Sequence, residues 1–121
     1  MDWIIVAITV ILLVAYIFLR RKGQISAETA IAYLKQGAIV IDVRNPAEYS
    51  TGHLKGAINI PLPQIDSLIV SEIKDKNQVL LLHCQSGARS GMAKNRLDAL
   101  GYTRVFNLGS YDRAAHIINV S

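Results

Sequence analysis

Residues 79–90 read VLLLHCQSGARS, and this stretch decides how the rest of the chain is arranged. Its first four residues are apolar, which is typical of a short strand that is buried on both faces. The strand leads to Cys84 and then to a loop of small and polar residues. An amphipathic helix is expected to follow over residues 88–100. The sequence therefore predicts a strand, a tight loop and a helix N-terminus in succession.

The loop after Cys84 has the composition of an anion-binding site. Backbone N–H groups in such a loop can point inward, and the positive end of the helix dipole adds to their field. The same surroundings favour the thiolate, which is the species that attacks. Gly87 permits the backbone to approach a bound anion closely, and Arg89 supplies a fixed cation that can pair with an oxyanion. The alternative is a small core cysteine that is inert because it is buried.

We expect Cys84 to be the catalytic residue. The loop residues expected to bind the substrate are Gln85, Ser86, Gly87, Ala88, Arg89 and Ser90.

Four segments together resemble a single-domain rhodanese, a member of the sulfurtransferase family. They are CQSGARS at residues 84–90, IDVR at 41–44, Glu48-Tyr49, and GHLKGAINIPL at 52–62. The match covers about residues 25–113 in the order of the family. The resemblance implies a persulfide on the cysteine as the catalytic intermediate, and neither a metal nor an organic cofactor is expected.

The chain departs from the family pattern near its end. Ser110 stands where the family usually has a second glycine, and Ala114 lies near the position of the usual tryptophan. This departure bears on the packing of the last helix, whereas the residues expected to carry the chemistry are unaffected.

Strands and helices alternate along the chain. Strands are expected near residues 24–26, 39–43, 57–60, 79–82 and 104–108. Helices are expected over residues 27–36, 46–49, 64–73, 88–100 and 111–118. This alternation predicts an α/β fold with a central parallel sheet of about five strands and helices on both faces. The resemblance implies that this fold is rhodanese-like.

Asp42 and Arg44 fall with Cys84 at the carboxyl ends of their strands, where such sheets bind ligands. We expect both to support the site, but from opposite faces of the strand. Arg44 is expected to form a structural ion pair with Glu48, four residues further on.

The three histidines do not suggest a catalytic base or a metal site. His83 precedes Cys84 in the strand, so its side chain should point away from the thiol. His53 lies in a turn beside a glycine and is expected to be structural. His116 falls in the last helix, and no spacing among the three suits zinc.

An apolar run at residues 3–19 precedes this domain. As a helix it would be about 25 Å long, at the short end of what crosses a bilayer. A cleaved signal peptide would carry basic residues before the run and a small-x-small cleavage site after it. Here the basic triplet at residues 20–22 follows the run, which favours a permanent anchor.

The expected organisation is a transmembrane anchor with a basic flank at residues 1–22 and a rhodanese-like domain at residues 23–121. The protein should cross the membrane once. Because positive flanks stay in the cytoplasm, the catalytic domain should face the cytoplasm.

Composition limits the partners further. The net charge is +4, and the triplet at residues 20–22 supplies three of the positive charges. The other basic residues are scattered and not interleaved with aromatic residues, so no nucleic-acid partner is expected. The single cysteine excludes an intramolecular disulfide and fits a reducing compartment. Any sulfur carried by Cys84 must therefore leave to an external acceptor.

The expected function is sulfur transfer. The Cys84 thiolate takes a sulfane sulfur from a small anionic donor such as thiosulfate and passes it to a thiol or to cyanide. Cysteine phosphatases and arsenate reductases that resemble this family have five residues between cysteine and arginine, whereas Cys84 and Arg89 have four between them. A silent membrane-tethered binding module is the third alternative, and the retained Cys84 disfavours it.

Overall fold

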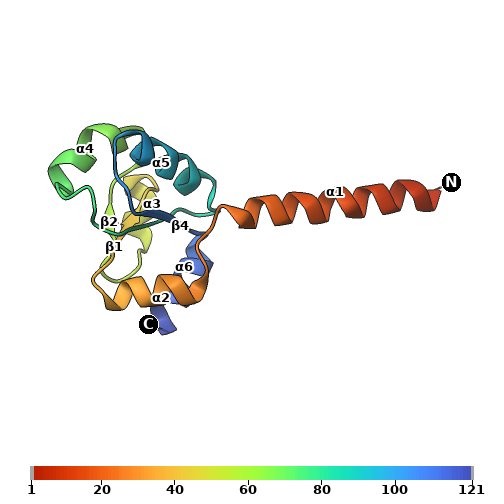
Figure 1. The fold of residues 1–121 in the computed structure, drawn as a ribbon, viewed down its shortest axis with the longest axis horizontal. Coiled ribbons are helices and arrows are strands. Elements are labelled where there is room, and N and C mark those ends of the chain that lie inside the picture. The colour runs from red at the N-terminus through yellow and green to blue at the C-terminus, as the bar shows by residue number, and fades with distance from the viewer. Residues whose placement is uncertain (1, 121) are drawn as a thin grey trace.

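The computed structural model describes residues 2–120, without the side chains of residues 20–22 (Figure 1). Its helices are α1 (Asp2–Lys22), α2 (Ala27–Lys35), α3 (Pro46–Thr51), α4 (Ile65–Glu72), α5 (Ala88–Ala99) and α6 (Tyr111–Val120), with a 3-10 turn η1 (Leu62–Gln64). Its strands are β1 (Ile39–Asp42), β2 (Ile58–Asn59), β3 (Leu80–His83) and β4 (Val105–Gly109). Helix α1 projects from a compact α/β domain made by the other elements.

The strands form one parallel sheet in the order β2-β1-β3-β4. Across residues 2–120 the sheet thus has four strands rather than the expected five or so. The first expected strand, at residues 24–26, is reduced to a parallel bridge between Gln24 and Asn107. It stops there because Ser26 already caps α2, accepting a hydrogen bond from the backbone N–H of Thr29.

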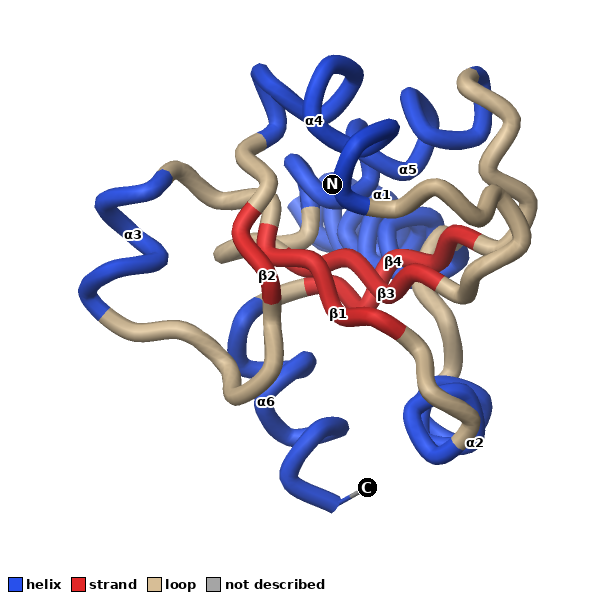
Figure 2. The backbone as a smooth tube through the Cα atoms, turned by 90° about the vertical axis from the view of Figure 1, so that its left-hand side faces the viewer, coloured by secondary structure: helices blue, strands red, loops and turns tan. Residues whose placement is uncertain are grey.

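Helices cover both faces of the sheet, as the sequence predicts. Helices α4 and α5 lie on one face, and α2 and α6 lie on the other (Figure 2). Alternate strand residues feed the two cores because successive side chains point to opposite faces. Ile41 and Leu82 pack toward α4 and α5, whereas Val40 and Leu81 pack toward α2 and α6.

The helix expected over residues 64–73 starts earlier, as the 3-10 turn η1, and continues as α4. The last helix is capped by Ser110, whose hydroxyl accepts a hydrogen bond from the N–H of Arg113 at 3.1 Å. Ala114 is fully buried against the sheet. The departures from the family pattern at these two positions therefore leave α6 well packed.

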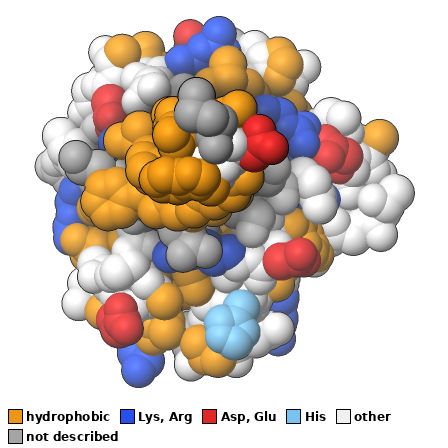
Figure 3. Space-filling view, turned by 90° about the vertical axis from the view of Figure 1, so that its right-hand side faces the viewer, with side chains coloured by type: hydrophobic (Ala, Val, Ile, Leu, Met, Phe, Trp, Pro, Cys, Tyr) orange, Lys and Arg blue, Asp and Glu red, His pale blue; other side chains and the backbone are white. Residues whose placement is uncertain are grey.

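The apolar part of helix α1 is not packed into the core of the domain. Its window Asp2–Leu19 is not buried at all, and it is long and apolar enough to cross a membrane. Figure 3 looks along this helix from its N-terminal side and shows hydrophobic side chains around it. The domain and α1 thus expose surfaces of different character.

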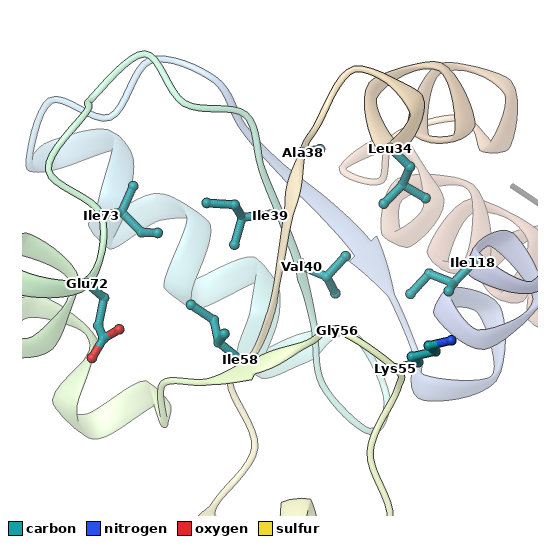
Figure 4. A pocket seen from close by; sticks show the side chains of 10 residues that line it. All are labelled: Leu34, Ala38, Ile39, Val40, Lys55, Gly56, Ile58, Glu72, Ile73 and Ile118. Atoms are coloured by element: carbon teal, nitrogen blue, oxygen red, sulfur yellow. The ribbon is translucent and has the colours of Figure 1, made fainter.

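A cavity of about 490 Å³ lies at the amino ends of β1 and β2. Aliphatic side chains such as Ile39, Ile58 and Ile118 line it, together with Lys55 and Glu72 (Figure 4). Because Cys84 follows the carboxyl end of β3, this cavity lies at the other end of the sheet from the expected nucleophile.

Candidate functional site

Cys84 directly follows β3 and is completely buried. Its backbone N–H donates a hydrogen bond to the carbonyl of Gly109, at the end of β4, at 3.3 Å. This bond fixes the start of the loop against the neighbouring strand. The nucleophile expected from the sequence therefore lies at the carboxyl edge of the parallel sheet, where a ligand site is expected.

The thiol of Cys84 is held by donors of its own loop. The backbone N–H of Gly87 donates to Sγ at 3.0 Å, and the Ser90 hydroxyl lies 3.6 Å from Sγ. Burial alone would raise the pKa of the Cys84 thiol. The N–H groups of Ser90, Gly87 and Ser86, together with the nearby Ser90 hydroxyl, outweigh burial and lower this pKa.

Two glycines shape the loop. Gly87 caps α5 with φ +98°, and Gly109 ends β4 with φ +97°. Residues that carry a side chain rarely adopt these backbone conformations. The two residues are also in close contact, since a Cβ atom at Gly87 would lie 3.2 Å from the Cα of Gly109. Both positions therefore require glycine for conformation, and Gly87 requires it for space as well.

Asn107 supports the loop from β4, and the sequence reasoning did not find it. Its side-chain carbonyl accepts hydrogen bonds from the Ser90 hydroxyl at 2.7 Å and from the N–H of Gly109 at 2.8 Å. Its amide donates to the carbonyl of Gly87 at 3.2 Å. The signal available in the sequence was a polar residue between the apolar residues of VFNLG. Such a residue, once buried in a strand, needs hydrogen-bond partners.

Arg89 is paired with an acidic side chain at the rim of the site. Its two terminal nitrogens contact the carboxylate of Glu48 at 2.6 and 3.0 Å. Hydrogen bonding by Arg89 lowers the pKa of Glu48 to about 2, against the opposing effect of burial. Glu48 in turn raises the pKa of Arg89, and the nearby Cys84 adds to this effect.

The expectation that Asp42 and Arg44 point to opposite faces is wrong. The Asp42 carboxylate accepts hydrogen bonds from Arg44 Nε at 3.0 Å, from Nη2 at 2.8 Å and from its backbone N–H at 2.9 Å. The physical reason is that residues two apart in an extended chain lie on the same side. The expected Arg44–Glu48 pair is also wrong, because Glu48 binds Arg89 instead.

Arg44 connects the end of β1 to the loop and to two helices. Besides Asp42, it donates to the carbonyl of Gly52 after α3 at 2.8 Å and reaches Gln85 Oε1 at 3.5 Å. Its guanidinium lies 4.7 Å from the ring centre of Tyr111 in α6. The buried Asp42–Arg44 pair thus lies beneath the loop rather than at its centre.

Two of the three histidines contact other side chains of the domain. The ring of His83 is buried, 3.8 Å from the Asp42 carboxylate and in edge contact with Tyr111, and burial lowers its pKa. His53 stacks on Tyr49 at 3.9 Å, a structural role. Within residues 2–120, no three His, Cys, Asp or Glu side chains are grouped so as to hold a metal.

Comparison with known proteins gives consistent matches. The family model of the rhodanese-like domain matches residues 26–114. The thiosulfate sulfurtransferase PspE of Escherichia coli (strain K12) is 45% identical over 69 residues, which are 57% of this chain and 66% of that protein. A solved structure of rhodanese with anions from E. coli has a TM-score of 0.62 and 40% identity, and the match covers 64% of this chain and 91% of that one.

A protein named for another activity is also similar. M-phase inducer phosphatase 2 of Rattus norvegicus is 31% identical over 80 residues, which are 55% of this chain but only 14% of that protein.

Proposed function

The chain belongs to the rhodanese-like domain family, and on that premise we propose that it is a membrane-anchored sulfurtransferase acting through a persulfide on Cys84. The observation that carries the proposal is the N–H of Gly87, which donates to the buried Sγ at 3.0 Å. This bond and its neighbours in the loop lower the pKa of the thiol. The site therefore favours the thiolate and offers fixed donors for an anion.

In the first step the Cys84 thiolate attacks the outer sulfur of thiosulfate. The bond between Sγ and this sulfur forms as the bond between the two sulfur atoms of thiosulfate breaks, and sulfite leaves with the electron pair. In the second step an acceptor thiol or cyanide attacks the outer sulfur of the persulfide, and the Cys84 thiolate is restored. Because the chain has one cysteine, the acceptor must come from outside.

The direct test is the mass of the purified protein after incubation with thiosulfate. We expect a gain of one sulfur atom per chain, which a reductant removes. An unchanged mass would contradict the persulfide mechanism.

The similarity to a phosphatase makes phosphoryl transfer the second candidate. Four residues separate Cys84 from Arg89, so the loop is one residue shorter than the loop expected for cysteine phosphatases. A transferred sulfur is one atom, whereas a phosphoryl group carries oxygens around its centre and would be held off axis. Misplacement by about 1 Å can lower a rate on the order of a hundredfold. We therefore expect no hydrolysis of an aryl phosphate, and efficient hydrolysis would favour the phosphatase assignment.

Arg89 is proposed to bind the oxyanion of the donor while it stays paired with Glu48. A guanidinium has five N–H donors, and the two contacts to Glu48 leave others free. Arg89→Ala should weaken the use of thiosulfate by about 1.5–3 kcal/mol, the scale of a charge-assisted hydrogen bond. The measurement is kcat/KM for thiosulfate, with the exposed Arg104→Ala as the control. Unchanged kinetics in the Arg89 variant would contradict a role in binding the donor and would show that Arg89 serves only to hold Glu48.

We further propose that α1 anchors the protein through residues 3–19 and leaves the domain in the cytoplasm. The basic triplet at residues 20–22 supports this orientation. A membrane-impermeant maleimide is much bulkier than a small alkylating reagent, and Cys84 is buried, so this experiment needs an exposed thiol. Lys74→Cys in a Cys84→Ser background provides one. A membrane-impermeant maleimide should label it after lysis but not in intact cells. Labelling in intact cells would place the domain outside.

A further inference from the structure

The segment that connects α1 to α2 lies against the end of β4. Gln24 forms a parallel bridge with Asn107, and the N–H of Ile25 donates to the carbonyl of Asn107 at 3.0 Å. Gly23 lines a hollow of about 470 Å³ together with Gly87 and Ala88 of the loop. The connection to the anchor thus runs directly beside the loop that carries the nucleophile.

The side chain of Gln24 covers the two glycines of the site. A Cβ atom at Gly109 would lie 2.9 Å from Nε2, 3.0 Å from Cδ and 3.1 Å from Oε1 of Gln24. A Cβ atom at Gly87 would lie 3.2 Å from the same Nε2. The amide group of Gln24 therefore occupies the space that side chains at these two positions would fill.

Each of these two glycines holds Cys84 through a backbone group. Gly87 donates its N–H to Sγ at 3.0 Å, and Gly109 accepts the N–H of Cys84 at 3.3 Å. Protein interiors transmit small displacements because they are closely packed. A change in the contact made by Gln24 therefore reaches the thiol through a single residue on either path.

We propose that Gln24 is a positioning residue, whose amide packs on Gly87 and Gly109 and keeps the loop donors aimed at Cys84. Gln24 precedes residues 26–114, which the family model covers, so the linker from the anchor completes a site that the domain otherwise builds. The effect on sulfur transfer rests on the proposed function, whereas the effect on the thiol itself does not.

The test uses the full chain in detergent micelles. Gln24→Ala opens the space beside the two glycines, and we expect transfer from thiosulfate to fall roughly tenfold, a fraction of the loss that a full 1 Å misplacement can cause. The pH dependence of Cys84 alkylation by iodoacetamide should move to higher pH, because loosened N–H donors stabilise the thiolate less. Gln24→Met fills the same space and should behave like the wild type. Gln36→Ala, an identical change at the exposed end of α2, is the matched control.

The two readouts separate the two proposals. A wild type that transfers no sulfur would refute the sulfurtransferase assignment, while the alkylation profile would still decide the role of Gln24. A Gln24→Ala variant with the wild-type rate and alkylation profile would overturn the proposal. An equal loss of sulfur transfer in Gln24→Met and Gln24→Ala would overturn the packing argument. The thermal midpoint of each variant is measured as well, so that a variant that fails to fold is recognised.

Discussion

Cys84→Ser should reduce sulfur transfer from thiosulfate to the background rate. A serine hydroxyl does not ionise near neutral pH, so the variant lacks the nucleophile that attacks the donor. The exchange replaces one atom and keeps an acceptor for the N–H of Gly87, which lies 3.0 Å from Sγ in the wild type. We therefore expect the free energy of unfolding to change by less than about 1.5 kcal/mol, the scale of one hydrogen bond.

Two measurements check this expectation on the same preparation. The first is thiosulfate turnover together with the mass of the protein after incubation, and the second is the thermal midpoint. No other thiol can take over, because Cys84 is the sole cysteine of the chain. Transfer that survives in Cys84→Ser would therefore show that the nucleophile has been assigned wrongly.

Features coded by short segments could be predicted from the sequence. The apolar run before Cys84, the small and polar residues of the loop after it, and the alternation of strand and helix patterns each depend on a few neighbouring residues. They were sufficient to predict parallel strands with helices on both faces, and the loop at the start of α5. The apolar helix at the N-terminus follows from composition alone.

Contacts between distant segments could not be predicted in this way. Arg89 and Glu48 are 41 residues apart, and Ser90 and Asn107 are 17 apart, so no local spacing links either pair. The Asp42–Arg44 pair was local but was missed, because alternation along a strand was applied to residues two apart as though they were adjacent. The contact of Gln24 with the glycines depends on how the linker lies beside β4, which only the tertiary structure determines.

We expect Asp42→Asn to be the variant that lowers stability most. Asp42 is fully buried and Arg44 is 4% exposed, and the carboxylate receives three donors from Arg44. The amide of asparagine keeps the shape of the side chain but removes its charge, and Arg44 then stays buried as an unpaired cation. Breaking a buried pair in this way costs about 3–5 kcal/mol. The loss should appear in urea unfolding followed by circular dichroism.

Two further variants test whether the uncompensated charge is the cause. Asp98→Asn makes the same chemical change in an exposed pair with Lys94, and it should cost no more than about 0.5 kcal/mol. The double variant Asp42→Asn/Arg44→Met removes the buried cation as well. It should recover part of the stability lost in Asp42→Asn, because no buried charge then remains without a partner. A double variant less stable than Asp42→Asn would show instead that the contacts of Arg44 with Gly52 and Tyr111 contribute more than the pairing with Asp42.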